Sequence, residues 1–569
     1  MVSSDRKGQN SLCAMKTRIR CCDVALAIIG ILCVILGILG LALFPSLYES
    51  IVFSQLQLTG DLETNSLGIS TRLLATPPMN NQMMFYFFNV TNQDEMMYEG
   101  APPRVIQIGP YNFLETEEKR YLQFNEDNTQ LYYQNYKKWV YSQDISCEDC
   151  NYHDFVTIPN APQVGCAAGL GNPKYHVTPV AKFIISLGLI VLGEQPFNTP
   201  RVGDLLFDGY QDALLSGAHS HLIDVLDTVF NRGKSIIPIP VPAMHTMAYF
   251  NGYNNSRDEE YWVNTGKDDV YNFGKVESWA GTKVLPEDWW TTEQARMING
   301  SDTGSLGPPH LTQDSVLPMF HSYLCRSFNS RYEGKTEIHG IPSYRFSVKE
   351  DEWDTTLEKN KGFRYPNYEK VKYYDWPKCP YYNSSNCRAR PDEPIDCSRA
   401  ENLCDDCCYQ GYTGGTWVMP PGMFPLACYP GRLQPSPFGV IWSPPHFLYS
   451  PKEVSSSIKG INPDPKEHQP MIYDHEPYSG MITHVNYRVQ ISVPVFDVSE
   501  VIQNSHLPSS MVPVFWEGSE TYLADFAYSF YTLGFVFAPK FSLGISIALI
   551  VLGAIFLLAL AIRVYRNRK

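Results

Sequence analysis

Two uninterrupted apolar stretches decide the architecture of this chain, VALAIIGILCVILGILGLALF at 24–44 and FSLGISIALIVLGAIFLLALAI at 541–562. Neither contains a charged residue, and they are 21 and 22 residues long. At about 1.5 Å of rise per residue, a helix of either length crosses a hydrocarbon layer of roughly 30 Å. The sequence therefore predicts a membrane protein with one span near each end.

Basic residues lie on the outer side of both stretches. Residues 1–23 contain five Lys or Arg, and residues 563–569 contain four. Short segments rich in Lys and Arg stay cytosolic, so we expect both termini in the cytosol. The predicted organisation is a cytosolic tail (1–23), a transmembrane helix (24–44), an extracellular or lumenal domain (45–540), a transmembrane helix (541–562) and a second cytosolic tail (563–569).

The segment between the spans has the composition of a secreted domain. It holds eleven of the 15 cysteines, as is typical of an oxidising compartment. Asn-x-Ser/Thr glycosylation acceptors occur in it at Asn89, Asn254, Asn299 and Asn383. Such acceptors matter only on a chain that passes through the secretory lumen. We therefore expect a disulfide-bonded glycoprotein domain.

Charge narrows the partners of this domain. Nine of the 45 basic residues and two of the 59 acidic residues lie in the tails, which leaves 36 basic and 57 acidic residues, a net charge of −21, between the spans. A domain this acidic does not hold a polyanion by bulk electrostatics. The charge therefore disfavours both nucleic acid as a partner and generic capture of anionic lipoproteins, and we predict no nucleic-acid partner.

Periodicity between the spans favours strands over helices. The run 83–90 is continuously apolar, 121–133 has the pattern of a hairpin turning at 125–128, and 487–495 alternates as a half-buried strand. Residues 222–230 show helical spacing instead. The predicted class is α+β with a mostly antiparallel sheet in one large domain.

One apolar segment is too short to cross a bilayer. The ten residues 183–192 are apolar nearly all round, which is typical either of a buried core helix or of a helix that touches lipid. Both interpretations stay open. The side chains in question are Phe183, Ile184, Ile185, Leu187, Leu189 and Ile190.

A dense cysteine cluster lies among polar and turn-forming residues. Its members are Cys379, Cys387, Cys397, Cys404, Cys407 and Cys408. A zinc site combining Cys404 and Cys407 with Cys147 and Cys150 is the alternative, but the oxidising compartment favours disulfides. Because eleven is odd, one cysteine stays unpaired, and Cys166 is the candidate if Cys147 bonds Cys150.

Catalytic signatures are missing from the sequence. No nucleophile elbow, zinc-protease motif, P-loop or dinucleotide fingerprint occurs, and 474–476 is interpreted as a structural turn beside Pro477. We predict no enzyme, no cofactor and no metal. A two-span channel is disfavoured because neither span has an ionisable residue. The small-residue pairs Cys33/Gly37 and Gly544/Ala548 suit a homo-oligomer formed through the spans.

Several motifs together resemble the class B scavenger receptor family. They are Gly109-Pro-Tyr111, Met297-Ile-Asn-Gly-Ser-Asp302, Leu324-Cys-Arg-Ser327, Gly340-Ile-Pro-x-Tyr-Arg-Phe346, Pro445-His-Phe-Leu-Tyr449, Gly460-Ile-Asn-Pro463 and Asp474-x-Glu-Pro477. The resemblance covers both spans and most of the domain between them, and the motifs occur in the family's order.

The resemblance implies an antiparallel β-barrel core with a helical apex and an apolar tunnel. It also implies a receptor that binds fatty acids, sterols, other lipids or lipid-bearing particles and passes lipid to the bilayer. An adhesion or recognition receptor for a protein ligand, without lipid transport, is the alternative. The C-terminal tail lacks lysosomal sorting signals, so the cell membrane is expected rather than the lysosome.

Two residue-level expectations follow from the resemblance. Cys325 and Cys428 occupy positions that pair in the family, which implies a disulfide between them. The segment that resembles the apex helix, 180–193, has Lys182 as its only cation, whereas lipoprotein-binding relatives carry several lysines there. Capture of an anionic ligand at this helix is therefore disfavoured, and lipid contact through 183–192 stands beside burial as an open interpretation.

Overall fold

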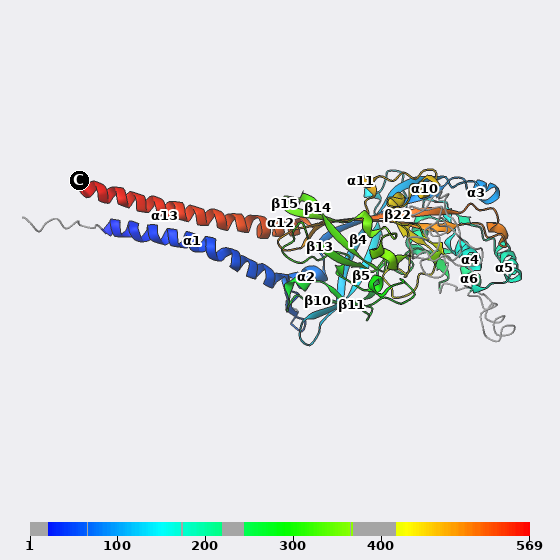
Figure 1. Ribbon diagram of the computed structural model, residues 1–569, viewed down its shortest axis with the longest axis horizontal. Coiled ribbons are helices and arrows are strands. Elements are labelled where there is room, and N and C mark those ends of the chain that lie inside the picture. The colour runs from blue at the N-terminus through cyan, green and yellow to red at the C-terminus, as the bar shows by residue number, and fades with distance from the viewer. Residues whose placement is uncertain are drawn as a thin grey trace, which may run out of the picture. The chain divides into compact units, whose positions relative to one another are not determined.

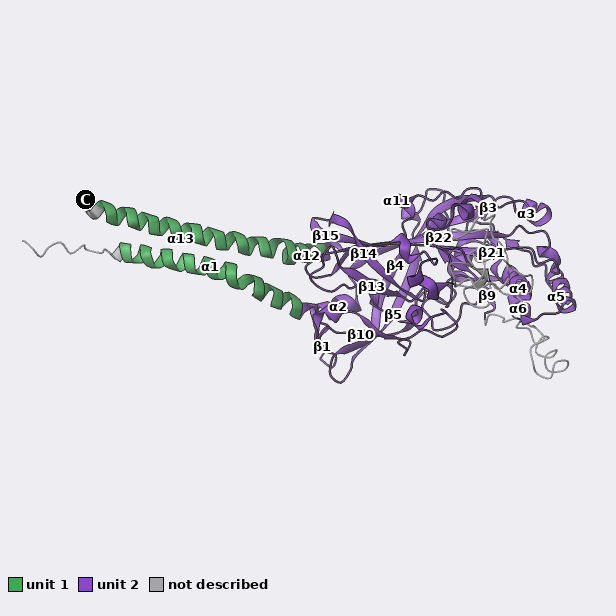
Figure 2. Cartoon of the chain, in the orientation of Figure 1, with its two compact units in different colours: residues 1–54, 528–569 green, residues 55–527 purple. Residues whose placement is uncertain are grey.

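The computed structural model describes residues 21–64, 66–171, 175–218, 244–364, 366–367 and 417–568. Its contacts divide the chain into two units (Figure 2). Unit 1 comprises residues 1–54 and 528–569, and unit 2 comprises residues 55–527. The large sheet and the helices that surround it all belong to unit 2, whereas the two long terminal helices form unit 1.

Unit 1 contains α1 (Cys21–Leu56), whose last residues enter unit 2, and α13 (Ala538–Arg568). Both contain windows of mean hydropathy 3.0, long enough to cross a membrane. The helix α1 does not end at Phe44 but continues through Pro45. The two helices run side by side (Figure 1), and Gly37 allows close approach, because a Cβ there would lie 2.6 Å from Ile550 Cγ1.

The core of unit 2 is one large sheet whose neighbouring strands are antiparallel except for one parallel pair. In spatial order its main path is β11 (Val276–Trp279), β10 (Ser256–Asn264), β5 (Gln130–Tyr141), β4 (Val105–Phe124), β3 (Met79–Val90), β22 (Ser510–Leu523), β21 (Ile482–Val495), β20 (Met471–His475), β15 (Ile341–Val348), β14 (Arg326–Ile338), β13 (Val316–His321) and β12 (Ser301–Asp302). Beside this path, β18 (Phe424–Pro425) pairs with β19 (Ile441–Ser443), which pairs with β21.

The two ends of the strand path meet and nearly close the sheet. Lys275, just before β11, forms an antiparallel bridge with Ser301 of β12, and Val276 N donates to Gly300 O at 2.8 Å. Gly300 has φ +86° and lies so close to β13 that a Cβ would be 1.9 Å from Pro318 O. Only glycine fits this closure. The predicted α+β class with a barrel core is confirmed.

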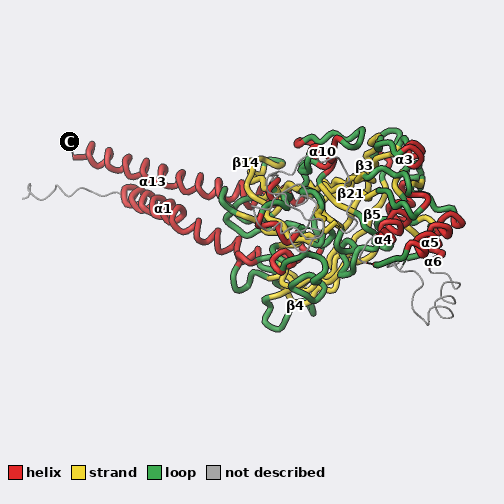
Figure 3. Tube along the Cα trace, turned by 45° about the vertical axis from the view of Figure 1, so that its right-hand side comes forward, coloured by secondary structure: helices red, strands yellow, loops and turns green. Residues whose placement is uncertain are grey.

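Short helices cover the barrel. Their bounds are α2 (Ile69–Ala75), α3 (Gln93–Glu99), α4 (Ala161–Gly171), α5 (Pro179–Leu192), α6 (Ala213–Ala218), α8 (Glu293–Arg296), α10 (Lys452–Ser456) and α11 (Pro465–His468). A further helix, α12 (Asp525–Tyr531), spans the boundary between the two units in the sequence. Figure 3 shows α4, α5 and α6 grouped at one end of unit 2. Two-stranded ladders add β1 (Gly60–Asp61) with β2 (Ser66–Leu67), β6 (Ile158–Pro159) with β7 (Phe197–Asn198), β8 (Tyr210–Gln211) with β9 (Thr246–Met247), and β16 (Pro366–Asn367) with β17 (Trp417–Val418).

The predicted hairpin and the apolar strand are confirmed as β4–β5 and β3. The hairpin turn is fixed by side chains, because Asn125 Oδ1 accepts from Gln130 N at 2.9 Å and Asp127 Oδ1 from Thr129 N at 3.1 Å. Asn128 occupies the left-handed region with φ +57°, which asparagine tolerates better than most residues. The turn thereby sets the register of the adjoining residues of β4 and β5, up to a register shift between Arg120 and Gln123.

The half-buried interpretation of 487–495 is wrong. These residues form the C-terminal part of β21, a central strand, and Gln490 and Ser492 are fully buried. The segment around His446 covers the outer face, with His446 N donating to Gln490 Oε1 at 2.7 Å. Because Gln490 also donates to Ser492 at 3.2 Å, polar side chains satisfy one another there instead of facing water.

Candidate functional site

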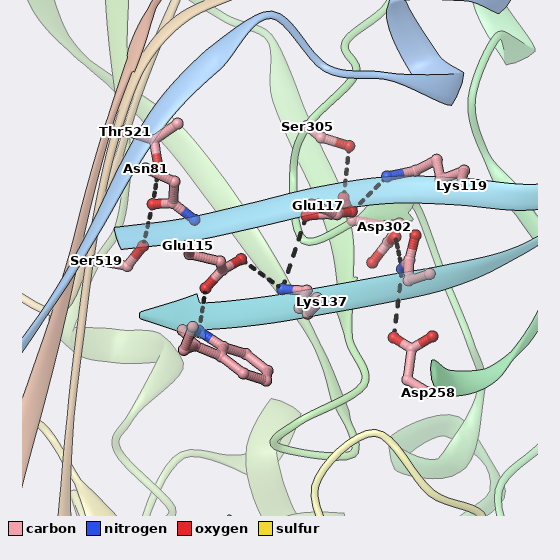
Figure 4. Close-up of polar contacts among 12 residues, drawn as sticks. Asn81, Glu115, Glu117, Lys119, Lys137, Asp258, Asp302, Ser305, Ser519 and Thr521 are labelled. Carbon is pink, nitrogen blue, oxygen red and sulfur yellow. Dashed lines mark hydrogen bonds and ion pairs between the residues drawn. The ribbon is translucent and has the colours of Figure 1, made fainter. Parts of the chain in front are cut away.

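Alternating residues of β4 and β5 carry charges into the barrel. Glu117 lies opposite Lys137, and Glu115 opposite Trp139, in the hairpin register. Lys137 Nζ is 3.1 Å from Glu115 Oε1 and 3.7 Å from Glu117 Oε2. Glu117 also pairs with Lys119, so that it lies between two ammonium groups (Figure 4). Trp139 Nε1 donates to Glu115 at 2.8 Å.

These pairs balance one another electrostatically. Burial would raise the pKa of Glu117, but the ammonium groups of Lys119 and Lys137 lower it to about 2. Burial would likewise lower the pKa of Lys137, and the carboxylates of Glu115 and Glu117 hold it well above its usual range. Glu117 and Lys137 are therefore charged together inside the barrel.

Further along the hairpin, an amide joins two acidic residues. Asn135 Nδ2 donates to Asp258 Oδ2 at 3.3 Å and to Asp302 Oδ2 at 3.2 Å. Burial raises the pKa of both carboxyls. Among the described residues, no group of three or more His, Cys, Asp or Glu is arranged to hold a metal ion.

Two cavities lie within the barrel of unit 2. The first, here the polar cavity, has a volume of about 170 Å³ and is lined by Glu115, Lys137, His321, Ser519 and other side chains. The second, here the apolar cavity, has a volume of about 50 Å³, with Phe250, Leu426, Phe438, Val489 and Phe515 in its wall. Both are lined by Tyr323, Tyr487 and Glu517. The cavities are therefore neighbours that share one wall.

The shared wall and the polar cavity contain polar atoms without protein partners. Within the described part of the chain, Glu517 Oε2, Tyr487 Oη and His321 Nδ1 are buried and make no hydrogen bond. Burial, followed by the nearby Glu115 carboxylate, raises the pKa of Glu517 to about 8. Burial also lowers the pKa of His321 to about 3, which keeps its ring neutral. The His321 ring stacks on Tyr487 at a centroid distance of 4.7 Å.

Aromatic side chains fill the barrel beyond the apolar cavity. Phe85 contacts Phe113, Phe250 and Phe515 edge to face at centroid distances of 5.5 to 5.8 Å. Phe207 stacks on Phe250 at 5.4 Å. Offset and edge-to-face contacts of this kind are the arrangements that aromatic rings prefer, and they make this part of the core apolar.

The segment 183–192 lies on helix α5, which begins after Thr178 and ends before Gly193. Ile184 is 61% exposed, Phe183, Leu187 and Ile190 are also exposed, Ile185 is half-buried, and Leu189 is 1% exposed. Leu189 therefore packs inward and is not available for contact, whereas Val191 beside it is 86% exposed. Lys182 pairs with Glu500 at 3.3 Å, so its charge is already compensated.

The structure forms two disulfides among the described cysteines. Cys325 bonds Cys428 across a Cα separation of 6.1 Å, and Cys147 bonds Cys150. Cys166 carries a free thiol. The cluster Cys379, Cys387, Cys397, Cys404, Cys407 and Cys408 lies outside the described residues, as do Asn383 and the helix predicted at 222–230. Their structure stays a prediction.

The remaining glycosylation acceptors occupy different settings. Asn299 and Asn254 are exposed, whereas Asn89 is half-buried within β3. The side chain of Asn254 bridges the backbone N–H and C=O of Trp139 at 3.0 and 3.1 Å. Residues 474–476 lead into a turn in which Glu476 accepts hydrogen bonds from Tyr478 N and from Ser479, in keeping with the structural interpretation.

Sequence reasoning missed the buried charges and both cavities. One signal was available in the predicted hairpin, because residues at alternate positions share a face and Glu115, Glu117 and Lys119 therefore lie on the same side of their strand. No comparable signal identifies Glu517, which comes from a strand almost 400 positions later in the sequence.

The chain resembles known proteins over most of its length. It is 42% identical over 482 residues to an uncharacterised protein of Caenorhabditis elegans, with 84% of this chain and 86% of that one covered. It is 26% identical over 507 residues to scavenger receptor class B member 1 of Rattus norvegicus, covering 88% and 81%. It is also 27% identical over 440 residues to lysosome membrane protein 2 of Homo sapiens, covering 77% and 74%.

The sequence model of the CD36 family matches residues 28–564, from within α1 to within α13. A class B scavenger receptor is among the relatives, so the resemblance drawn from the motifs is confirmed. By the extent of this match, and by its similarity to the Caenorhabditis elegans protein over most of both chains, this chain belongs to the CD36 family.

Proposed function

We propose that this protein is a scavenger-type membrane receptor that binds lipids and passes them through the interior of unit 2. The observation that carries the proposal is the pair of neighbouring cavities with a common wall of Tyr323, Tyr487 and Glu517. An apolar path through the barrel spares a lipid about 0.8 kcal/mol of exposure per CH₂. Such transfer needs no catalytic residue and no cofactor.

Passage requires movement of side chains in the shared wall. A volume of about 50 Å³ holds only about three or four water molecules, which is too little for an acyl chain. Tyr323 and Tyr487 are tyrosines with two rotatable side-chain torsions, and rotation of either opens the wall without breaking the sheet. Lipid is therefore admitted by rotamer change and not through a permanently open channel.

The exposed face of α5 is the proposed site of first contact with lipid. Phe183, Ile184, Leu187 and Ile190 are exposed along one short helix, and apolar patches of this kind mark interaction sites. The compensated Lys182 leaves the helix without a free cation, which favours an uncharged lipid surface. Lipid-bearing particles present such a surface.

The proposed location is the cell membrane, with both termini in the cytosol and unit 2 outside. Basic residues flank the ends of both spans, and the positive-inside rule sets the orientation. The glycosylation acceptors and the two disulfides fit an oxidising exterior. The relatives include a lysosome membrane protein, so surface biotinylation of the full chain is the measurement that separates the two membranes.

Photo-crosslinking of the full chain in lipid nanodiscs tests the proposal. A photoreactive, clickable lipid is added, and the labelled peptides are identified by mass spectrometry. Labels on β21 and β22 side chains of the two cavities are expected. Val489→Phe, which fills the apolar cavity, should remove these labels, whereas Val140→Phe on the exposed face of β5 should keep them.

The opposite result assigns a different function. Labels confined to α1, α13 and the outer surface of unit 2, with no difference between the two variants, would contradict lipid passage. The protein would then be an adhesion or recognition receptor for a protein ligand, with a barrel interior that serves only the fold.

A further inference from the structure

The polar cavity contains hydrogen-bonding groups that the fold itself does not use. Glu517 and Tyr487 are each 9% exposed and His321 is 6% exposed, and all three line this cavity. Within the described residues, Glu517 Oε2, Tyr487 Oη and His321 Nδ1 lack hydrogen-bond partners. Buried polar atoms in native proteins are nearly always paired. Three such atoms around one cavity can hydrogen-bond a polar ligand.

Of the described charged side chains around the cavity, most form ion pairs, and one acidic side chain does not. Glu115 and Glu117 are matched by Lys137 and Lys119, whereas Glu517 has no ion pair among the described residues. Burial and the neighbouring Glu115 raise the pKa of Glu517 to about 8, so its carboxyl is mostly protonated at neutral pH. This acidic side chain, Glu517, is therefore a neutral carboxylic acid.

An anionic head group fits this cavity poorly. Lys137 is the one cation among the described residues that line it, and its ammonium group is already bound to Glu115 and Glu117. A fatty-acid carboxylate would face three carboxyl groups and find no free donor cation. Burying an unpaired charge costs several kcal/mol, so a carboxylate is disfavoured relative to an uncharged head group.

A hydroxyl group fits the unpaired atoms. It accepts one hydrogen bond and donates one, and here Tyr487 Oη supplies a donor while Glu517 Oε2 or His321 Nδ1 supplies an acceptor. The neighbouring apolar cavity, beyond the shared wall, offers space of the opposite polarity. A molecule with one hydroxyl and an apolar body matches the polarity of both sides, and the side-chain movement that passage requires makes room for the apolar body.

We propose that the polar cavity is a head-group site, formed by Tyr487, Glu517 and His321, for uncharged hydroxyl-bearing lipids such as sterols or monoacylglycerols. This inference rests on the proposed passage of lipid through unit 2. It adds a selection between lipids, in which the hydroxyl is held in the polar cavity and free fatty-acid anions are rejected.

Three photoreactive probes with the same crosslinker test this selection on the full chain in nanodiscs at pH 7. They are a sterol with a free hydroxyl, a long-chain fatty acid and a long-chain primary amine. We expect the sterol to label β21 and β22, and unlabelled sterol to compete at least tenfold better than unlabelled fatty acid. The amine controls for simple attraction to the acidic domain.

Variants test the hydroxyl contact itself. Tyr487→Phe should weaken sterol competition about threefold to tenfold, the range for loss of one hydrogen bond. Tyr132→Phe, which removes a hydroxyl from another strand of the same barrel, should have no effect. If Tyr487→Phe does not fold, as judged by its thermal unfolding midpoint, the comparison of the three probes on the wild type still decides.

The outcomes separate this inference from the proposed function. If the fatty acid or the amine labels the cavities as strongly as the sterol or more strongly, the head-group site is overturned but lipid passage stands. Unchanged sterol competition in Tyr487→Phe has the same consequence. Failure of all three probes to label the interior overturns both.

Discussion

Glu117 of β4 and Lys137 of β5 lie directly opposite each other on the inner face of the barrel, with 3.7 Å between Glu117 Oε2 and Lys137 Nζ. A second carboxylate, Glu115, is 3.1 Å from the same ammonium group. Lys137 therefore compensates two acids at once, the buried Glu115 and the half-buried Glu117. Its removal leaves a charge imbalance that the barrel cannot relieve by exposure to bulk water.

Lys137→Met should destabilise unit 2 by about 3 kcal/mol, because breaking a buried ion pair leaves an uncompensated charge. Lys119 remains paired with Glu117 in this variant, so the loss of stability lies at the lower end of the range usual for a broken buried ion pair. The urea midpoint of the full chain in detergent measures the loss. Lys138→Met is the matched control, since Lys138 is exposed on the same strand; equal midpoints for the two variants would contradict the buried network.

How much of this arrangement the sequence predicts depends on distance along the chain. The hairpin β4–β5 is local, and its turn at 125–128 could be identified from residue types alone. Counting outward from the turn, where Phe124 pairs with Leu131, would have placed Glu117 opposite Lys138 and not Lys137. The small register shift between Arg120 and Gln123 was not visible, and it moves the count by one residue.

Contacts between residues far apart in the sequence cannot be predicted from such local patterns. The alternation of 487–495 predicts the strand β21, and it also predicts that Gln490 faces water. The segment around His446 instead covers that face, and it lies about 40 residues earlier in the sequence. The closure through Gly300, and the meeting of Glu517 with Glu115, depend on strand order. Strand order comes from the fold as a whole and not from local pattern.

The Cys325–Cys428 disulfide should contribute more stability than Cys147–Cys150. It joins residues 103 positions apart, whereas the second joins residues 3 apart, and a longer loop loses more unfolded-state entropy when it is closed. Replacing Cys325 and Cys428 by Ala should cost about 4–5 kcal/mol, and replacing Cys147 and Cys150 about 2 kcal/mol. Thermal unfolding of both double variants tests the order, and a reversed order would contradict it.

Close contact between α1 and α13 should depend on Gly37. A Cβ at Gly37 would lie 2.6 Å from Ile550 Cγ1 and 2.7 Å from Ser546 O, whereas a Cβ at Gly544 would meet nothing within 4 Å. Gly37→Leu should therefore separate the helices, and Gly544→Leu should not. A disulfide between Gly30→Cys and Leu557→Cys, detected by mass spectrometry, reports the contact, because a Cβ at Gly30 lies 3.0 Å from Leu557 Cγ. Crosslinking that survives Gly37→Leu would contradict the packing.

Glu517 should make stability fall as pH rises. Its folded-state pKa is about 8, raised from 4.5 by burial, so the folded chain holds this proton more tightly than the unfolded chain does. The contribution is complete below pH 4.5 and is lost as pH rises to about 8, by up to about 1.4 kcal/mol per pH unit. Glu517→Gln stays neutral throughout, so its urea midpoint should gain on the wild type between pH 5 and pH 8 and stop gaining above pH 8. Glu337→Gln, at an exposed position in β14, should follow the wild type, and a Glu517→Gln curve parallel to the wild type would mean that this carboxyl is ionised in the folded barrel.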